Sequence, residues 1–207
     1  MTIIDDNPMP AVTGRVCYHP CEGACNRKDH DEPIGIRNVE RFLGDFGLEL
    51  AENPIKDTVP PVNGKRVAVV GSGPGGLACA YHARRLGYRV TVFEALSKAG
   101  GMMRGGIPHW HLPEDVLNKE VAKIEDLGDI EIKYDTRVGE DVSWDDLKDF
   151  DAAFIQRSIR YRHGWVLRGG EVAEAPKSKE APAEPVKEPS WLVGRARGPR
   201  LVMVGRG

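Results

Sequence analysis

The fold of this 207-residue chain is decided by residues 66–76, which read RVAVVGSGPGG. The run Arg66-Val67-Ala68-Val69-Val70 is short, apolar and followed by glycines, as expected of a buried parallel strand. Residues 71–76 match the spacing G-x-G-x-x-G, and a helix-like segment follows them as far as Leu86. Strand, glycine loop and helix in this order predict the start of a parallel β-α-β unit.

The glycine loop has the spacing that a bound pyrophosphate requires. Gly71 permits the tight turn, Gly73 lets the backbone approach the anion, and Gly76 lets helix and strand pack closely. The amides at the start of the helix then face the phosphates. The predicted loop contacts are Gly71, Ser72, Gly73, Pro74, Gly75 and Gly76. The alternative is a glycine turn in an ordinary α/β domain.

An acid stands where a ribose would be held. Residues 89–93 (RVTVF) predict the second strand, and Glu94 closes it, 23 residues after Gly71. A carboxylate at this point accepts hydrogen bonds from ribose hydroxyls and repels a 2′-phosphate. The site is therefore expected to favour FAD or NAD over NADP, and the spacing does not choose between FAD and NAD.

The chain continues the α/β alternation to about residue 155. A helix with one apolar face is predicted from Pro113 and Glu114 to about Leu127, then a strand at 130–134. Ser143 and Asp146 have the spacing of a capping box for a short helix, and residues 151–155 (DAAFI) form the next predicted strand.

Composition divides the rest of the chain. Residues 1–50 hold the clustered cysteines and a helix-like segment at 38–50, and residues 51–64 contain three prolines and read as a linker. Residues 65–155 form the predicted Rossmann domain, which is incomplete, and 156–207 a low-complexity basic tail. Residues 171–190 cannot build a packed core and are expected to be disordered, whereas 200–207 look like a strand entering a glycine turn.

The overall charge excludes some partner classes. The net charge is −2, which offers no general attraction to nucleic acid or anionic lipid. Residues 1–154 carry a net −8 and residues 155–207 a net +6. This switch suggests a frameshifted or truncated gene, and we interpret the basic tail as a solvated segment rather than a site for RNA or lipid. With no 18-residue apolar run and an acidic start, the chain is expected to be cytoplasmic.

Three cysteines form a candidate metal site. Cys17, Cys21 and Cys25 have the spacing C-x₃-C-x₃-C, and thiolates at this density bind iron–sulfur clusters or zinc. A zinc site would take His19 or His30 as its fourth ligand, and inert thiols are the third possibility. Cys79 lies inside the predicted helix that follows the glycine loop and is expected to be a small buried side chain.

Two longer stretches carry a family resemblance. GSGPGGLACAYHARRLGYRVTVFEA and KAGGMMRGGIPHWHLPEDVL resemble the FAD-binding segment of the glutamate synthase small subunit and dihydropyrimidine dehydrogenase family. The resemblance implies FAD contacts at Gly71, Ser72, Gly73, Pro74, Gly75, Glu94, Gly101 and Met102, with a main-chain contact at Val138. His111 stands where the family usually has a basic cofactor-site residue, and Gly105 where an aromatic residue is common.

The cysteine segment resembles a second part of the same family. NPMPAVTGRVCYHPCEGACNR and DEPIGIRNVERFLGD are similar to the second half of its helical domain for two [4Fe–4S] clusters. The resemblance assigns Cys17 and Cys21 to one cluster and Cys25 to the other, with most remaining ligands on an upstream stretch that this chain lacks. Thr13 stands where many relatives have a further cysteine, and Glu40 is either a ligand or a solvated helix acid.

The expected fold is therefore α/β: a small α-helical iron–sulfur module, an FAD-type Rossmann domain and a disordered C-terminal tail. The resemblance implies an electron-transfer flavoprotein subunit that passes electrons from NAD(P)H through FAD and [4Fe–4S] clusters to a larger partner oxidoreductase. The nicotinamide domain of the family is not recognised in this sequence, and a partner chain or lost upstream sequence would supply the missing cluster ligands. The alternative is a non-catalytic remnant or small dinucleotide-binding module whose cysteines hold zinc.

Overall fold

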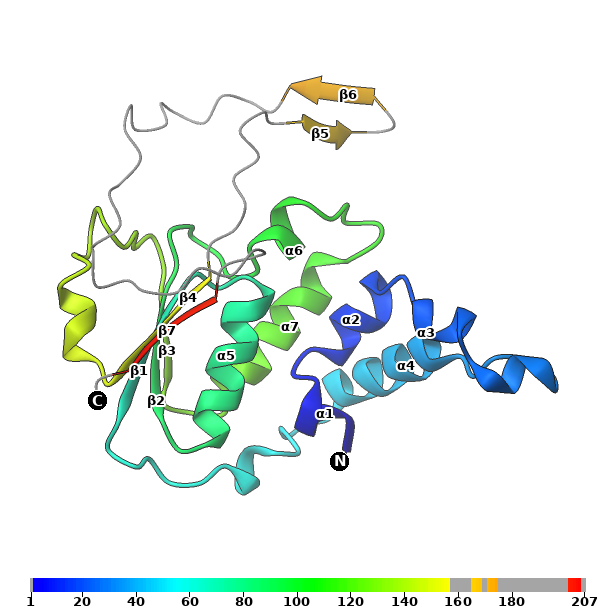
Figure 1. Ribbon diagram of the computed structural model, residues 1–207, viewed down its shortest axis with the longest axis horizontal. Helices are drawn as coiled ribbons and strands as arrows, with labels where there is room; N and C mark the ends of the chain where they lie inside the picture. The colour runs from blue at the N-terminus through cyan, green and yellow to red at the C-terminus, as the bar shows by residue number, and fades with distance from the viewer. Residues whose placement is uncertain (1, 157–164, 169–170, 175–200, 206–207) are drawn as a thin grey trace.

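The structure is a computed structural model that describes residues 2–156, 165–168, 171–174 and 201–205. Its centre is a five-stranded sheet with the order β3-β2-β1-β4-β7 (Figure 1). The strands are β1 Arg66–Val70, β2 Arg89–Phe93, β3 Ile130–Lys133, β4 Ala152–Gln156 and β7 Leu201–Gly205. The first four are parallel, and β7 pairs with β4 in the antiparallel direction.

Two helices cover one face of the sheet. Helix α5 (Pro74–Arg85) connects β1 to β2, and α7 (Glu114–Glu125) precedes β3. Ala80 of α5 packs on the valines of β1 and β2 that point to this face, namely Val67, Val69, Val90 and Val92. These five side chains are almost inaccessible to solvent, as the apolar runs of the strands predict.

The opposite face is covered by the chain between β3 and β4. The alternate strand residues Ala68, Phe93 and Ala153 point there and pack on Leu147 of the 3₁₀-helix η3 (Asp146–Asp149). Ser143 and Asp146 form the expected reciprocal cap, since the Ser143 amide donates to Asp146 and the Asp145 amide to the Ser143 hydroxyl. The sheet is therefore buried on both faces around β1.

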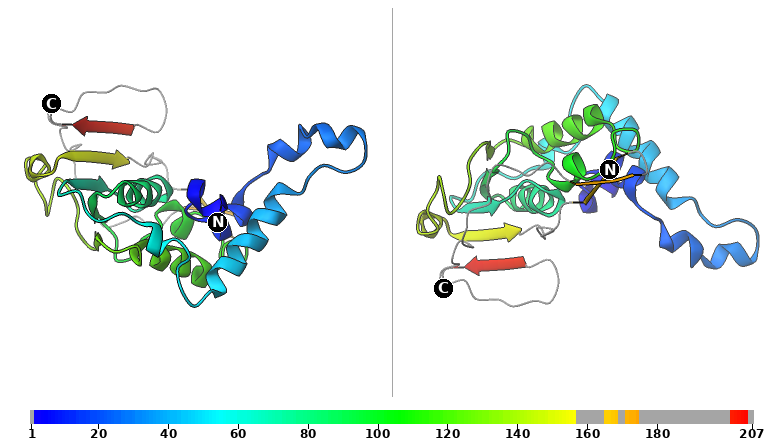
Figure 2. Two further views of the ribbon diagram at one scale, coloured as in Figure 1. Left: turned by 90° about the horizontal axis from the view of Figure 1, so that it is seen from below. Right: turned by 90° about the horizontal axis from the view of Figure 1, so that it is seen from above.

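The N-terminal quarter of the chain is a helical module. It comprises α1 Thr2–Asp6, α2 Pro10–Val16, α3 Pro20–Gly23, η1 Asn26–Asp29 and α4 Ile36–Glu49. Helices α2 and α4 cross at two glycines: a Cβ on Gly14 would lie 2.5 Å from Arg41 Cα, and one on Gly44 would lie 2.2 Å from Ala11 N. Residues 17–35, including α3 and η1, form an arm that projects away from the sheet in Figures 1 and 2.

The linker is held against the folded body. It contains η2 (Lys56–Thr58), and Ile55 is buried in the core between the helical module and α7. Asn53 Nδ2 donates to the Lys123 carbonyl at 2.8 Å, and the buried Arg84 donates to the Pro60 carbonyl at 2.8 Å. The linker therefore fixes the module against the sheet domain.

The α/β fold expected from the sequence is confirmed, including the strand near residue 201. One difference lies in the tail, where β5 (Trp165–Arg168) and β6 (Glu171–Glu174) pair antiparallel although the sequence showed no strand pattern there. The disorder expected for residues 171–190 is wrong at Glu171–Glu174, which form β6, and the rest of that stretch lies outside the described residues. Across the described ranges, no helix combines the length and apolar character needed to cross a bilayer.

Candidate functional site

The glycine loop lies at the carboxyl ends of β1 and β2, where open parallel sheets bind ligands. Gly71 has a φ of 94°, and its amide donates to the Phe93 carbonyl at 2.8 Å, so the turn is tied to the next strand. A Cβ at Gly76 would lie only 1.8 Å from the Gly71 carbonyl oxygen. Glycine at both positions is therefore required by this backbone, as the spacing predicted.

Ser72 is the centre of the loop. Its amide donates to Glu94 Oε2 at 2.8 Å, its hydroxyl donates to the same oxygen, and its carbonyl accepts from the Gly100 amide at 2.9 Å. Both Ser72 and Glu94 are buried, and the second carboxylate oxygen of Glu94 accepts from the Leu96 amide at 2.9 Å. The acid expected to hold a ribose thus also holds the glycine loop, a contact that the sequence did not reveal.

A second glycine turn lies against the first. Gly101 has a φ of 50°, and a Cβ there would lie 2.9 Å from Gly73 Cα. The short helix α6 (Met102–Gly105) begins at the next residue, and the Met102 side chain is half-exposed. The structure therefore brings Gly101 and Met102 to the loop formed by residues 71–76.

Of the two remaining expected cofactor residues, Val138 follows a segment bonded to this centre, because the Thr136 amide donates to the Glu94 carbonyl at 2.8 Å, whereas His111 lies in the turn before α7. Val138 is half-buried in the turn after β3, beside the core on the opposite face of the sheet. His111 is exposed, with its ring centroid 5.5 Å from that of Trp110, and it lines a cavity that faces α2 and α4. Cofactor contacts of Val138 and His111 stay predictions.

The three clustered cysteines lie along the projecting arm. Cys17 follows α2 and Cys21 lies in α3, both exposed, whereas Cys25 is half-buried before η1. Backbone amides favour the thiolate form of Cys25: those of Ile34 and Arg27 lower the pKa of its thiol. The His19 amide donates to Cys17 Sγ at 3.3 Å. Such N–H donors to sulfur suit metal-bound thiolates.

The arm does not by itself complete a metal site. In the part of the chain that the structure describes, no three Cys, His, Asp or Glu side chains converge on a common metal position. Glu40 is half-buried, and its Oε1 accepts hydrogen bonds from the Thr13 hydroxyl at 3.0 Å and from Asn7 Nδ2 at 2.5 Å. The His19 ring lies 3.8 Å from Glu22. Three thiols without further ligands fit only part of a cluster site.

Cys79 has a different environment. It is partly buried on α5 and packs against the core between this helix and the sheet. Burial raises the pKa of its thiol to about 11, which makes it an inert thiol at neutral pH.

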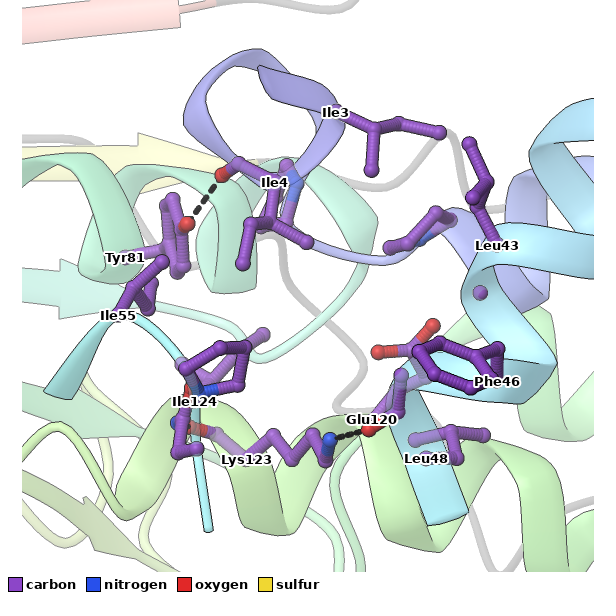
Figure 3. Close-up of a pocket in the computed structure, with 16 residues that line it drawn as sticks. Ile3, Ile4, Leu43, Phe46, Leu48, Ile55, Tyr81, Glu120, Lys123 and Ile124 are labelled. Atoms are coloured by element: carbon purple, nitrogen blue, oxygen red, sulfur yellow. Dashed lines mark hydrogen bonds between the residues drawn. The ribbon is translucent and has the colours of Figure 1, made fainter. Parts of the chain in front are cut away.

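A buried polar contact joins the helical module to α7, and the sequence analysis missed it. Glu120 Oε1 accepts from the Ala11 amide of α2 at 2.7 Å, and burial raises the pKa of this carboxyl to about 7. One turn later, Lys123 donates to the Gly47 carbonyl near the end of α4 (Figure 3). The sequence offered one signal for this contact, because Glu120 lies on the apolar face of the helix predicted after Pro113.

A mostly apolar cavity of about 280 Å³ adjoins this contact. Side chains from α1, α4, the linker and α7 surround it in Figure 3, among them Ile4, Phe46 and Ile55. The outer face of α4 continues the apolar surface, since its large apolar side chains are more than a third exposed. These are Ile36, Val39, Phe42, Leu43 and Phe46.

Comparison with known proteins places both parts of the chain. Residues 69–117 match a family model described as an NAD(P)-binding Rossmann-like domain. Residues 1–51 match the model for dihydropyrimidine dehydrogenase domain II, 4Fe-4S cluster.

Several relatives align over both parts. The β subunit of the NADP(+)-dependent formate dehydrogenase of Moorella thermoacetica is 41% identical over 172 residues, covering 73% of this chain and 24% of the relative. The β subunit of the NADPH-Fe(3+) oxidoreductase of Geobacter sulfurreducens is 43% identical over 75% of this chain and 23% of its own length. The small chain of the NADPH glutamate synthase of Bacillus subtilis is 36% identical, covering 81% and 34%.

The chain spans about a quarter to a third of the relatives it matches. The two family models follow each other in the order of the helical module and the sheet domain. Residues 1–51 and 69–117 are thus similar to an iron–sulfur domain and a Rossmann-like domain, and the chain resembles oxidoreductase subunits such as the small chain of glutamate synthase.

Proposed function

We propose that this chain is part of an electron-transfer flavoprotein subunit that binds FAD at the loop formed by residues 71–76. The arrangement of Ser72, Glu94 and Gly101 at the carboxyl ends of β1 and β2 carries the proposal. NAD(P)H would reduce the flavin, and electrons would leave through iron–sulfur clusters to a larger oxidoreductase. The relatives named as β subunits or small chains of NADPH-dependent oxidoreductases support this role.

The residues of the loop would hold the dinucleotide by its pyrophosphate and ribose. The amides at the start of α5 face the anion, and the close approach of Gly101 to Gly73 leaves no side chain between the two turns. A carboxylate offers about four acceptor sites, and in Glu94 three are used by Ser72 and Leu96. The remaining one can accept from a ribose hydroxyl.

The same carboxylate sets the preference among dinucleotides. Glu94 is buried and carries no basic partner among its hydrogen bonds, so a 2′-phosphate brought to this point would meet a negative charge. We therefore infer that the loop takes FAD or NAD rather than NADP. Between these two, FAD is favoured by the family, and it supplies hydride acceptance and one-electron transfer when bound.

The cysteine arm would contribute part of the cluster ligands. Cys17, Cys21 and Cys25 offer three thiolates, and a [4Fe–4S] cluster takes about four. The proposal therefore requires further ligands from polypeptide outside this chain. We likewise propose that residues 1–155 do not form the NADPH site, and that other polypeptide of the complete electron-transfer unit supplies it.

Anaerobic purification tests the assignment. We expect the full chain to retain FAD, identified after release, and to take up iron and sulfide during reconstitution. Cys17→Ser, Cys21→Ser and Cys25→Ser should each lower the iron content, whereas Cys79→Ser, on α5, should not. Failure to bind either FAD or NAD would overturn the flavoprotein assignment. A colourless protein with one zinc per chain would instead support a zinc-holding dinucleotide module.

A further inference from the structure

A second cavity lies where the helical module meets the turn before α7. Its volume is about 370 Å³, which falls in the range of small-molecule sites, about 300–1,000 Å³. Its lining residues are Gly14, Arg15, Arg37, Arg41, Trp110, His111 and Pro113. Only His111 among them was assigned to the flavin by the family resemblance, so the cavity is distinct from the glycine loop.

The crossing of α2 and α4 places the arginines. Gly14 lets α2 approach the backbone of α4 at Arg41, so the arginines of both helices reach the same rim. Arg37 and Arg41 are four residues apart and therefore lie one above the other on α4. The cavity opens between them and the Trp110 turn.

The cavity holds more cationic than anionic charge. Asp45, one turn beyond Arg41, binds Arg15 with two hydrogen bonds of 2.6 and 3.1 Å, and its second oxygen lies 3.7 Å from Arg41 Nε. One carboxylate thus serves two guanidinium groups. The nearby Glu22 accepts from the main-chain amide of Arg37 at 3.0 Å.

Arg37 has an unused guanidinium. Among the described residues, no carboxylate lies within 4.0 Å of its side-chain nitrogens, and its side chain makes no hydrogen bond. Like charges four residues apart on a helix repel each other and destabilise it. An anion bridging Arg37 and Arg41 would remove this repulsion and use the planar fork of each side chain.

Trp110 gives the cavity an aromatic wall. Its side chain is 84% exposed, although an indole of this size usually finds apolar cover. The exposed ring can stack on a flat partner, as aromatic side chains do on nucleobases. The cavity therefore has arginine side chains that can bind an anion and an indole that can stack on a ring.

We propose that this cavity binds a phosphate monoester carried on a planar ring, the chemistry of a nucleoside monophosphate. Arg37 and Arg41 hold the phosphate, Arg15 adds positive potential, the His111 ring nitrogens offer a further hydrogen bond, and Trp110 stacks on the ring. Apart from His111, which the family resemblance assigns to the cofactor, the contacts of this site come from α2, α4 and the turn at 110–113 rather than from residues 71–76.

Calorimetric titration with phenyl phosphate tests the proposal on the full chain. The probe contains the phosphate and the ring but lacks the adenine that the glycine loop could bind. We expect saturable binding that weakens as salt rises, with inorganic phosphate and phenol each binding less tightly. Arg37→Ala and Arg41→Ala should each raise the dissociation constant about tenfold. Trp110→Ala should raise it about tenfold through lost stacking.

The matched control is Arg27→Ala, which removes an exposed arginine of the same module that already pairs with Asp31. It should change the dissociation constant less than about twofold. FAD retention should be unaffected by Arg37→Ala, so loss of one function does not entail loss of the other. The proposal is overturned if phenyl phosphate does not bind at millimolar concentration, or if an oligoglutamate peptide binds more tightly and Trp110→Ala has no effect.

Discussion

Ser72 and Glu94, 22 residues apart, are joined by two hydrogen bonds to one carboxylate oxygen. The backbone amide donates to Glu94 Oε2 at 2.8 Å, and the hydroxyl donates to the same atom. The acid at the end of β2 therefore organises the turn after β1 before any ligand is considered. Because Glu94 both holds the turn and is proposed to accept a hydrogen bond from a ribose, its replacement should lower stability and dinucleotide affinity together.

Replacing Glu94 with Gln should lower both stability and dinucleotide affinity. Gln keeps only one acceptor oxygen, so at least one buried amide, that of Ser72 or that of Leu96, loses its acceptor, at a cost of about 1–3 kcal/mol in the free energy of unfolding. We expect the dissociation constant for FAD to rise about tenfold. Urea unfolding measures the first quantity and flavin titration the second.

Ser72→Ala separates the two tasks of Glu94. It removes the hydroxyl donor and keeps the amide contact, so it should reduce stability less than Glu94→Gln and leave the ribose contact in place. If Glu94→Gln binds FAD as tightly as the unchanged chain, the carboxylate has no part in holding the ribose.

Gly76→Ala should disrupt the loop by steric conflict. The added methyl group would meet the Gly71 carbonyl oxygen, and the backbone would have to shift, costing typically about 1–3 kcal/mol. The chain should fold with lower thermal stability and lose FAD. Gly47→Ala is the control, since a Cβ there has no neighbour within 4 Å. Equal stability of the two variants would contradict the described packing.

Glu120 should make stability depend on pH. Burial raises the pKa of its carboxyl from the ordinary 4.5 to about 7 in the folded state. The folded chain therefore holds the proton more tightly than the unfolded chain. The resulting stabilisation is complete below about pH 4.5 and disappears as the pH rises through 7.

Glu120→Gln should remove this dependence while the amide oxygen still accepts from Ala11. Between pH 5 and pH 8 the unchanged chain should lose roughly 2 kcal/mol of unfolding free energy relative to the variant. Denaturant unfolding at the two pH values measures the difference. Glu131→Gln, at an exposed position on β3, should run parallel to the unchanged chain. A pH-independent difference for Glu120→Gln would show that the carboxyl does not titrate in this range.

Arg84→Lys should loosen the linker. The buried guanidinium donates to the carbonyls of Gly128 and Pro60, both at 2.8 Å, and one ammonium cannot reproduce this fork. We expect a loss of about 2 kcal/mol in unfolding free energy and faster proteolysis within residues 51–64. Arg89→Lys is the control because its exposed side chain makes a weak contact of 3.4 Å with Asp129. If Arg84→Lys is cleaved at the same rate as the unchanged chain, Arg84 does not hold the linker against the sheet domain.

Local patterns were sufficient to predict the sheet domain. The apolar run at 66–70 and the glycines around α5 place β1 and α5 within a residue of their observed bounds, because both elements are specified by residues close in sequence. The antiparallel strands β5 and β6 were not predicted, because their four-residue segments WVLR and EVAE are short and lie in a stretch that is basic and rich in proline and alanine.

The site was only partly predictable, because its contacts join distant segments. The G-x-G-x-x-G spacing identified the loop, but the bonds from Ser72 to Glu94 and Gly100 depend on tertiary approach. Glu120 carried a local signal, an acid among the buried positions of α7, and its partner on α2 lies 109 residues away. The arginine cavity depends on the crossing at Gly14, which no periodicity in the sequence reveals.

The uncovered apolar side of α4 has a practical consequence for work with the isolated chain. With a net charge of only −2, the molecules repel one another weakly, so contact between two such helices meets little electrostatic opposition. Purified material should self-associate as its concentration increases. Replacing Phe42 and Phe46 with serine should improve its solubility without touching the glycine loop.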